Sequence, residues 1–258
     1  MYETLLLEKK DGIALVTLNK PESYNAMDMV MRVELYEILT ALARDDEAGV
    51  VVITGAGKAF CAGGDITTMG GSRPNAGRKR MQHVQRVTRA FMESEKPVVA
   101  AINGPCAGSG MALAMSCDLA LASDRAKFGL AFLKIGLVPD LGTFYLLPRI
   151  VGLRKAKELV LLSEIFDPAK ALDLGLVNRV VPHESLMEET WKLAQKLHRG
   201  PRIAQGLAMQ LLNKSYEMDY ETSLREEAFA QDLCMLTEDF REGIASFKEK
   251  RHPTFSGK

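Results

Sequence analysis

The chain has 258 residues, of which 47% are hydrophobic, and this is enough apolar material for one large core. Lys plus Arg and Asp plus Glu number 33 each, so no net charge favours nucleic acid or an anionic membrane as a partner. The first residues show no signal-peptide pattern, and no apolar run approaches the roughly 18 residues that span a bilayer. We therefore expect a globular cytoplasmic protein that meets any anionic ligand with a local basic cluster.

The cysteines give no sign of a metal site. Cys61, Cys106, Cys117 and Cys234 form no CxxC pair and have no regular spacing, so neither a zinc site nor a disulfide framework is expected. Cys61 and Cys106 lie in glycine-rich turns, where a reactive thiol is conceivable. The simpler interpretation is that both are small buried side chains that fill space in the core, and we assign neither of them a nucleophilic role.

In the first half of the chain, short strand-like runs alternate with helical patterns. Predicted strands cover 5–7, 13–18, 50–54, 98–102 and 119–122. The runs at 50–54 and 98–102 are dense in β-branched residues, which is typical of strands buried on both faces. An amphipathic helix is predicted over 27–44, with Asn25 and Asp28 near its start, where caps are favoured. These alternations predict an α/β fold.

The segment 70–91 begins like a loop and becomes helical near Arg80. It holds the densest basic run of the chain, made up of Arg73, Arg78, Lys79 and Arg80. A solvated loop and helix start explains most of these side chains, and one or two of them remain candidate phosphate partners.

The second half is predicted to be helical except for a strand at 177–181. Predicted helices cover 154–162, 168–174, 185–197, 202–216, 220–236 and 238–250. No linker rich in Pro, Gly and Ser separates the halves. We expect a core over 1–195 and a C-terminal helical region over 196–258 that serves as a flap or oligomerisation element and is not an independent domain.

The most informative feature is a pair of glycine-rich segments, AFCAGGDI at 59–66 and INGPCAGSGMALAMSCD at 102–118, each following an apolar strand-like run. Two such turns can aim two backbone N–H groups at one point, as the stabilisation of an oxyanion requires. The helix that begins at Ser109 would add the positive end of its dipole. Close packing of helix on strand is the alternative explanation of these glycines.

Two other site types are excluded by the same segment. After Gly108 and Gly110, the third glycine of a dinucleotide-binding fingerprint would fall on Leu113, so a Rossmann site is rejected. Ser109 is flanked by Ala107 and Met111 where a nucleophile elbow needs glycines, so serine hydrolase chemistry is not expected.

The order of several motifs resembles the crotonase family, also called the enoyl-CoA hydratase/isomerase family. They are TLNKPESYNAM at 17–27, the two glycine segments, VPDLGT at 138–143, LPRIVG at 147–152 and ALDLGLVNRVV at 171–181. The resemblance implies a spiral of ββα units with a helical C-terminal region. It also implies homotrimers, or dimers of trimers, that act on acyl-CoA thioesters with no cofactor beyond the CoA moiety of the substrate.

By position, the resemblance places the oxyanion hole at the backbone N–H groups of Gly64 and Ser109. It places the path of the adenine and pantetheine along the residues from 62 to 66, which are Ala62, Gly63, Gly64, Asp65 and Ile66. Lys20, Lys248 and Lys250 are candidate partners for the CoA phosphates. Surface lysines that merely solvate a helix are the alternative.

The chain departs from the family's hydratases at two positions. Where those enzymes carry two glutamates, this chain has Ala112 and Phe132. Some isomerases of the family use a single acid a few residues further on, and Asp140 matches that place. Asp140 would act as the base in an apolar pocket walled by Phe132, Leu133 and Leu137. The alternative from the local sequence is that Asp140 is an ordinary residue of a type I turn.

Three functions stay open at this stage. The first is an acyl-CoA isomerase that shifts a β,γ double bond to α,β, on fatty or ring-containing acyl groups, with Asp140 as single acid/base. The second is an enoyl-CoA hydratase or another lyase of the same fold. The third is an acyl-CoA-binding member without catalysis.

Overall fold

The computed structural model of the chain describes residues 2–68 and 75–258. Its strands are β1 (Leu5–Lys10), β2 (Ile13–Leu18), β3 (Val50–Gly55), β4 (Val98–Ile102), β5 (Cys106–Ala107), β6 (Leu119–Ser123), β7 (Phe128–Gly129), β8 (Ile165–Phe166) and β9 (Arg179–Val181). Its helices are α1 (Met29–Ala43), α2 (Ala76–Met92), α3 (Ser109–Ser116), α4 (Thr143–Leu162), α5 (Pro168–Asp173), α6 (Leu186–His198), α7 (Arg202–Lys214), α8 (Tyr220–Met235) and α9 (Glu238–Glu249). Short 3₁₀ helices are η1 (Pro21–Ser23), η2 (Ile66–Thr68), η3 (Ala131–Ile135) and η4 (His183–Ser185).

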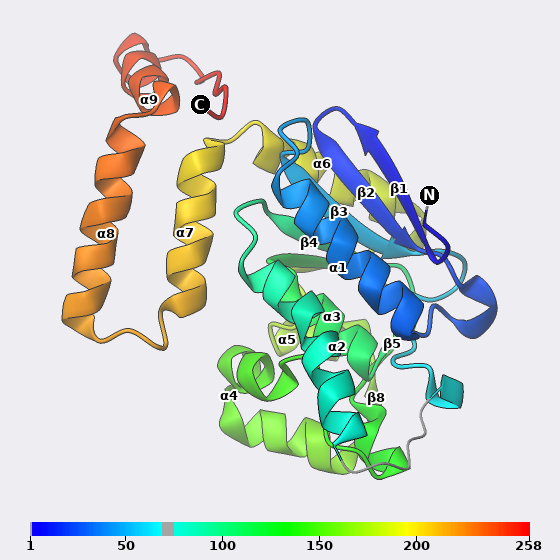
Figure 1. Ribbon diagram of the computed structural model, residues 1–258. Helices are drawn as coiled ribbons and strands as arrows, with labels where there is room; N and C mark the ends of the chain where they lie inside the picture. The colour runs from blue at the N-terminus through cyan, green and yellow to red at the C-terminus, as the bar shows by residue number, and fades with distance from the viewer. Residues whose placement is uncertain (1, 69–74) are drawn as a thin grey trace.

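The main sheet has six strands in the order β1-β2-β3-β4-β6-β9 (Figure 1). Strands β1 and β2 form an antiparallel hairpin, and every later neighbour in the sheet is parallel. A second, small sheet has the order β5-β7-β8. The predicted α/β class is confirmed, and the small sheet was missed because two-residue strands leave no periodic pattern in a sequence.

The central strand β3 is buried on both faces, as its β-branched run predicted. Val50 and Val52 belong to the apolar cluster that α6 covers, and Val51 and Ile53 belong to the larger cluster on the opposite face, under α1 and α2. Successive side chains of a strand point to opposite faces, so one strand supplies both cores. The parallel sheet is therefore sandwiched between helices. A site can form at the carboxyl ends of its strands.

The cap of α1 follows the sequence prediction. Asp28 is the N-cap residue, and its Oδ1 accepts a hydrogen bond from the Met31 N–H at 2.8 Å. Asn25 does not cap the helix. Its side-chain amide nitrogen donates to the carbonyl oxygens of Ala56 and Ala59 at 2.9 and 2.8 Å. Asn25 thereby ties the segment before α1 to the first glycine turn.

Two predicted boundaries were wrong. Helix α2 begins at Ala76 and not near Arg80. Helix α4 begins at Thr143, about three turns before the predicted start at 154, and passes through non-helical φ/ψ at Gly152. Pro148 disfavours a helix by local propensity, and tertiary packing of Leu146 and Leu147 into the core overrides that preference. Gly152 does interrupt the helix, because α4 consists of two helical stretches that meet at this residue.

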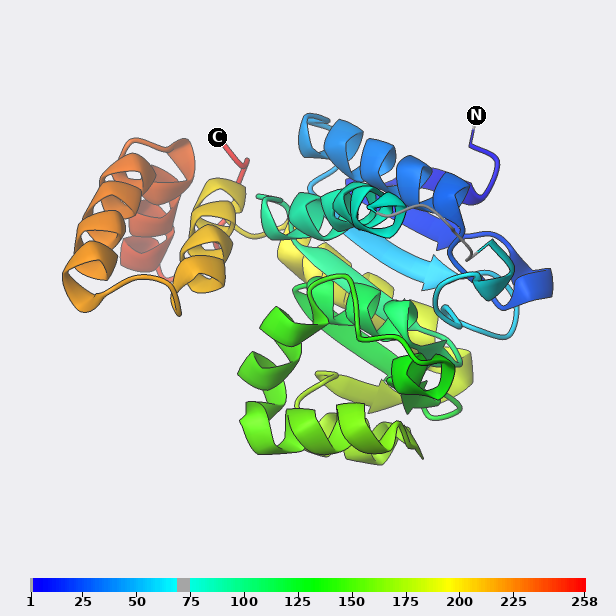
Figure 2. The ribbon, with the colours of Figure 1, turned by 60° about the horizontal axis from the view of Figure 1, so that its bottom comes forward.

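Helices α7, α8 and α9 stand beside the sheet and do not cover it (Figures 1 and 2). Helix α7 is joined to the core through Gln210, whose side-chain nitrogen donates to the carbonyl oxygens of Met92 and Ser94 at 3.3 and 3.1 Å. Helix α8 packs on α7, and α9 packs on α8. In the described part of the chain, no helix is both long enough and apolar enough to cross a membrane.

Candidate functional site

The two glycine-rich turns lie against each other at one edge of the main sheet. They follow β3 and β4, and neighbouring parallel strands end at the same edge, where open α/β sheets bind their ligands. The N–H of Ala107 donates to the carbonyl oxygen of Cys61 at 2.9 Å. At Gly110 an added Cβ would lie 2.2 Å from that same oxygen. The turns thus touch through their backbones, and Gly110 is required for that approach.

Two backbone donors on these turns have no partner among the described residues. Neither the Gly64 N–H nor the Ser109 N–H donates a hydrogen bond to a residue that the structure describes. Gly63 has φ +116°, and a Cβ there would lie 3.6 Å from the backbone nitrogen of Ser109, so the turns face each other at this point. Ser109 begins α3, where N–H groups have no intrahelical partner and the helix dipole is positive. Such donors can bind an oxygen atom that carries negative charge.

Asp140 lies beside the second turn. The hydroxyl of Ser109 donates to Asp140 Oδ1 at 2.9 Å. The Asp140 side chain is 16% exposed, so it lies mostly within the protein. The residue predicted as base and one residue predicted to supply a donor are therefore in direct contact, although they are 31 positions apart.

The turn that carries Asp140 is not the type I turn considered from the sequence. The Asp140 carbonyl oxygen accepts the N–H of Thr143 at 3.0 Å and its hydroxyl at 2.7 Å. The two residues between them, Leu141 and Gly142, have φ +51° and +77°, whereas a type I turn has negative φ at both. Leu141 is buried, and this packing offsets a left-handed conformation that costs a non-glycine residue about 1–2 kcal/mol. Strain of this kind concentrates at functional sites.

Burial raises the pKa of Asp140 above its ordinary value. The nearby positive charge of Arg32 and the hydrogen bond from Ser109 act in the opposite direction and lower it, and Arg80 adds a smaller lowering effect. A carboxylate with a raised pKa is a better proton acceptor than one in water. The arrangement can therefore remove a proton from a carbon acid whose oxyanion lies on the two backbone donors.

Arg32 is the site residue that the sequence analysis missed. It lies on α1, its side chain is 3% exposed, and Nη1 is 4.0 Å from Asp140 Oδ2. Arg32 occupies the same buried stripe of α1 as Leu35 and Leu39. This position within an apolar stripe was the signal in the sequence that could have identified Arg32. An arginine at a core position of a helix is seldom buried without a partner.

The two positions at which the family's hydratases carry glutamates are apolar and buried here. Ala112 is fully buried in α3. The ring of Phe132 lies close to the second turn, 3.9 Å from where a Cβ on Gly108 would stand. Phe132 is buried, but Leu133 and Leu137 are more than a third exposed, so only one of the three expected wall residues is enclosed.

The expected CoA path and Lys20 lie at the first turn. Ala62 N–H donates to the Tyr24 carbonyl oxygen at 2.9 Å, and Asp65 N–H donates to the Met27 carbonyl oxygen at 3.1 Å. Ile66 is exposed at the start of η2. The Lys20 ammonium forms an ion pair with Asp28 at 2.6 Å, so a phosphate at this place would have to share Lys20 with a carboxylate.

The other basic residues are scattered. Arg73 lies outside the described residues, and Arg78 and Lys79 are exposed on the first turn of α2. Helix α9, which carries Lys248 and is capped by Lys250, lies on the far side of the molecule from β5 (Figures 1 and 2). Within one copy of the chain, these two lysines therefore do not approach the glycine turns.

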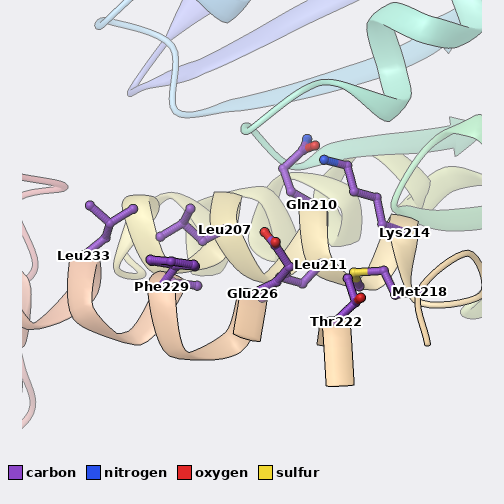
Figure 3. Close-up of a pocket in the computed structure, with 10 residues that line it drawn as sticks. Leu207, Gln210, Leu211, Lys214, Met218, Thr222, Glu226, Phe229 and Leu233 are labelled. Atoms are coloured by element: carbon purple, nitrogen blue, oxygen red, sulfur yellow. The ribbon is translucent and has the colours of Figure 1, made fainter. Parts of the chain in front are cut away.

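Two hollows of the described surface lie elsewhere. One of about 420 Å³ runs between α7 and α8 (Figure 3), with apolar walls from Leu207, Leu211, Phe229 and Leu233. A second, of about 620 Å³, lies between α7 and the residues that precede β4 and β6. Asp140, Gly64 and Ser109 line neither of them. Among the described residues, no three His, Cys, Asp or Glu side chains are grouped as a metal site would need.

An α/β sheet that presents two backbone donors, unpaired among the described residues, beside a mostly buried carboxylate defines a class of enzyme suited to oxyanion chemistry. Comparison with known sequences gives the family. The sequence model described as enoyl-CoA hydratase/isomerase matches residues 8–258. The chain belongs to the enoyl-CoA hydratase/isomerase family, the crotonase family that its motifs resemble.

Individual relatives cover the whole chain. The 1,2-epoxyphenylacetyl-CoA isomerase of Escherichia coli K12 is 36% identical over 100% of both chains. The crotonyl-CoA hydratase of Syntrophomonas wolfei is 35% identical over 100% of this chain and 99% of its own. The crystal structure of an enoyl-CoA hydratase from Bacillus anthracis superimposes with a TM-score of 0.94 at 31% identity, covering 99% of this chain and 100% of that one. The crotonase fold is thus shown, whereas the relatives include both isomerases and hydratases.

Proposed function

We propose that the protein is an acyl-CoA isomerase that shifts a β,γ double bond to the α,β position, with Asp140 as its single acid/base. The observation that carries the proposal is the contact between Asp140 and Ser109. It joins a mostly buried carboxylate to a residue whose backbone N–H has no partner among the described residues. Its substrates would be acyl-CoA thioesters of fatty-acid or aromatic catabolism. No cofactor beyond the CoA moiety of the substrate is required by this chemistry.

The proposed reaction needs one carboxylate. Asp140 removes a proton from the carbon next to the thioester carbonyl, and the charge of the resulting dienolate spreads onto the carbonyl oxygen. The N–H groups of Gly64 and Ser109 stabilise that oxygen. Asp140 then returns the same proton two carbons away, and the double bond becomes conjugated with the thioester. The carboxylate ends in its starting state, so the cycle needs no second acid.

Apolar side chains at the two hydratase positions support an isomerase. Ala112 and Phe132 have no group that could activate or orient a water molecule. The similarity to a relative named 1,2-epoxyphenylacetyl-CoA isomerase makes a ring-containing acyl group a reasonable substrate. Hydratases of comparable similarity keep a second candidate open, namely an enoyl-CoA hydratase in which Asp140 acts with another acid. A member that only binds acyl-CoA is the third.

We further propose that residues 62–66 and Lys20 contact the CoA moiety. The backbone of this segment includes the Gly64 donor and lies near Lys20. The hydrogen bond with Asp28 raises the pKa of Lys20, and the charge of Asp65 adds a smaller rise. Lys20 would bind a phosphate by leaving Asp28. The exposed Ile66 would then be covered by the ligand.

We also propose that the core over 1–195 assembles through the C-terminal region 196–258 into a homotrimer or a dimer of trimers. The support is uncovered apolar surface on this region. Helix α8, whose residues are all described, has none that is fully buried. Its exposed large apolar side chains, with those of the segment leading to α9, are Tyr220, Leu224, Phe229, Leu233, Met235 and Leu236.

The test uses the ultraviolet absorbance of the conjugated enoyl thioester. A β,γ-unsaturated acyl-CoA is incubated with the wild type and with Asp140→Ala, whose fold is checked by circular dichroism. We expect product with the wild type and a loss of about 10²–10⁴-fold in the variant, as for removal of a general base. Equal rates would remove Asp140 from the mechanism. No product with either protein would favour the hydratase or the binding member, and hydration of an α,β-enoyl-CoA would then separate those two.

A further inference from the structure

A buried arginine side chain without a full set of partners points at Asp140. Arg32 is 3% exposed, yet its Nη1 has no hydrogen-bond partner among the described residues. Its Nε donates only a long hydrogen bond, 3.4 Å, to the carbonyl oxygen of Met27. Leaving a charged donor buried and unpaired is unfavourable, so such a group needs an explanation.

The two oxygens of Asp140 are each linked to a different glycine turn. Oδ1 accepts from the Ser109 hydroxyl, and Ser109 belongs to the second turn. Oδ2 faces Arg32, which is bonded to the Met27 carbonyl, and that carbonyl also accepts the N–H of Asp65 in the first turn. The carboxylate therefore lies on a bridge between the two backbone segments that supply the proposed oxyanion donors.

The length of the Arg32 contact is informative. At 4.0 Å, Nη1 is near enough to attract the charge on Oδ2 but too far for a hydrogen bond. A tight, bidentate arginine pair would occupy the lone pairs of the carboxylate and make it a poor base. At the observed distance the positive charge acts on Asp140 while a lone pair of Oδ2 stays available to a substrate proton.

We propose that Arg32 is a positioning residue for Asp140, whose charge keeps the carboxylate ionised and, with Ser109 on the other oxygen, fixes its orientation between the two glycine turns. This inference rests on the proposed role of Asp140 as the acid/base. Arg32 would not touch the substrate, because its side chain is only 3% exposed and lies on the buried face of α1.

The charged and titratable groups around the carboxylate are few. Arg32 faces it from α1 and Arg80 from α2, and both lower its pKa, while burial raises it. Cys61 of the first turn is fully buried, and burial raises the pKa of its thiol to about 11, so it stays neutral near pH 7. Ser109 of α3 contributes a hydroxyl. The pKa of Arg32 is itself lowered by burial and raised by Asp140, which is the reciprocal effect.

A direct test measures the carboxyl group and does not depend on activity. Protein labelled with ¹³C at the aspartate carboxyl carbons is titrated by NMR, and the Asp140 signal is assigned by its loss in Asp140→Asn. In Arg32→Met we expect the pKa of Asp140 to rise by about 1–3 units, the usual effect of losing an opposite charge at this distance. Arg32→Lys keeps the charge and should restore most of the shift.

A matched control residue lies at the C-terminal end of the same helix, α1. Arg44 is exposed at the C-terminal cap of α1, so Arg44→Met removes the same charge far from the carboxylate and should leave the pKa of Asp140 unchanged. A shift in Arg32→Met no larger than that in Arg44→Met would overturn the proposal. Arg32→Gln gives the same measurement if Arg32→Met does not fold. If neither neutral variant folds, Arg32 acts on stability and the proposal is equally overturned.

Kinetics then separate this inference from the proposed function. In Arg32→Met the acid limb of the pH profile of kcat/KM should move upward with the pKa of Asp140. The kcat should fall most at low pH and recover at higher pH, while KM changes less than twofold. A purely structural defect would not recover with pH. If the wild type does not isomerise any substrate, the proposed function fails, and the NMR titration still decides the role of Arg32.

Discussion

The edge of the sheet that carries the two glycine turns and the helices α7 to α9 differ in how their surfaces are covered. At the sheet edge, backbone meets backbone so closely that Gly110 has no space for a methyl group. In the C-terminal region, Leu212 of α7, Tyr216 of the connection to α8 and Phe247 of α9 are each 70% exposed or more. In the first region, the two turns contact each other within one chain. The second presents apolar surface that one chain does not cover.

This difference separates two requirements of the same protein. The sheet edge must hold the donors and Asp140 to within a fraction of an ångström, and close packing provides that rigidity. For the proposed assembly, the C-terminal helices need only to be amphipathic, because exposed apolar patches are typical of interaction sites. Substitutions should therefore affect activity in the first region and assembly in the second.

The largest effect is expected for Gly110→Ala. The new methyl group would lie 2.2 Å from the Cys61 carbonyl oxygen, so the two turns must separate. We expect a loss of about 1–3 kcal/mol in the free energy of unfolding, as for overpacking. The donors would also be displaced, and a shift near 1 Å can cost about 100-fold in rate. Urea unfolding and the isomerisation assay measure the two effects.

The same change at Gly77 is the control. Gly77 lies in α2, and a Cβ there meets no atom within 4 Å. Alanine is the better helix former, so Gly77→Ala should stabilise the protein by up to about 1 kcal/mol. A loss of stability in Gly77→Ala as large as in Gly110→Ala would show that the effect of Gly110→Ala does not come from its backbone contact.

An intermediate effect, confined to assembly, is expected for Phe247→Glu. Phe247 is 85% exposed on α9 of one chain, and a charged residue there should weaken an apolar interface by about 2 kcal/mol or more per subunit if it lies near the centre. Light scattering after gel filtration should show a smaller particle than the wild type. Lys248→Glu changes the charge of the neighbouring position and should keep the wild-type mass. An unchanged mass for Phe247→Glu would contradict its place in the interface.

The smallest effect is the pH dependence of stability at Asp140. Its pKa is raised in the folded state, so its contribution to stability is fully present below the unfolded pKa and is lost as the pH rises through the folded pKa. Asparagine does not ionise, so the Asp140→Asn variant does not lose stability at this position as the pH rises. The variant should therefore gain stability relative to the wild type as the pH rises through that window, as measured by urea unfolding from pH 4 to pH 8. A constant difference across this range would mean that burial does not govern the carboxyl group.

Much of the fold could be predicted from the sequence. Dense β-branched runs identified β3 and β4, and helical spacing identified α1 and the helices from α6 onward, because these patterns reflect burial on one or two faces. The first stretch of α4, from Thr143 to the kink at Gly152, could not be predicted, since Pro148 argues against a helix locally and only its packing environment decides otherwise. The small sheet escaped prediction because its strands are too short for a pattern.

The candidate site was predicted in part. Glycine spacing and the family resemblance pointed to Gly64, Ser109 and Asp140, and their roles stay predictions that the variants above test. Arg32 was missed, since an arginine among leucines on a helix has no assigned partner in one dimension. Its distance to Asp140 arises only when α1 packs over the sheet edge.

The sequence by itself determined the class of fold, the family and the two glycine turns, because periodicity and glycine placement are local properties of the chain. Tertiary structure alone decided which groups surround Asp140. The folded chain brings the Ser109 hydroxyl to Oδ1 of Asp140 from 31 positions away in the sequence. It brings Arg32, on helix α1, to Oδ2 of the same carboxylate. The acidity of a buried carboxyl group depends on its distance from charges and from water, and those distances exist only in the folded protein.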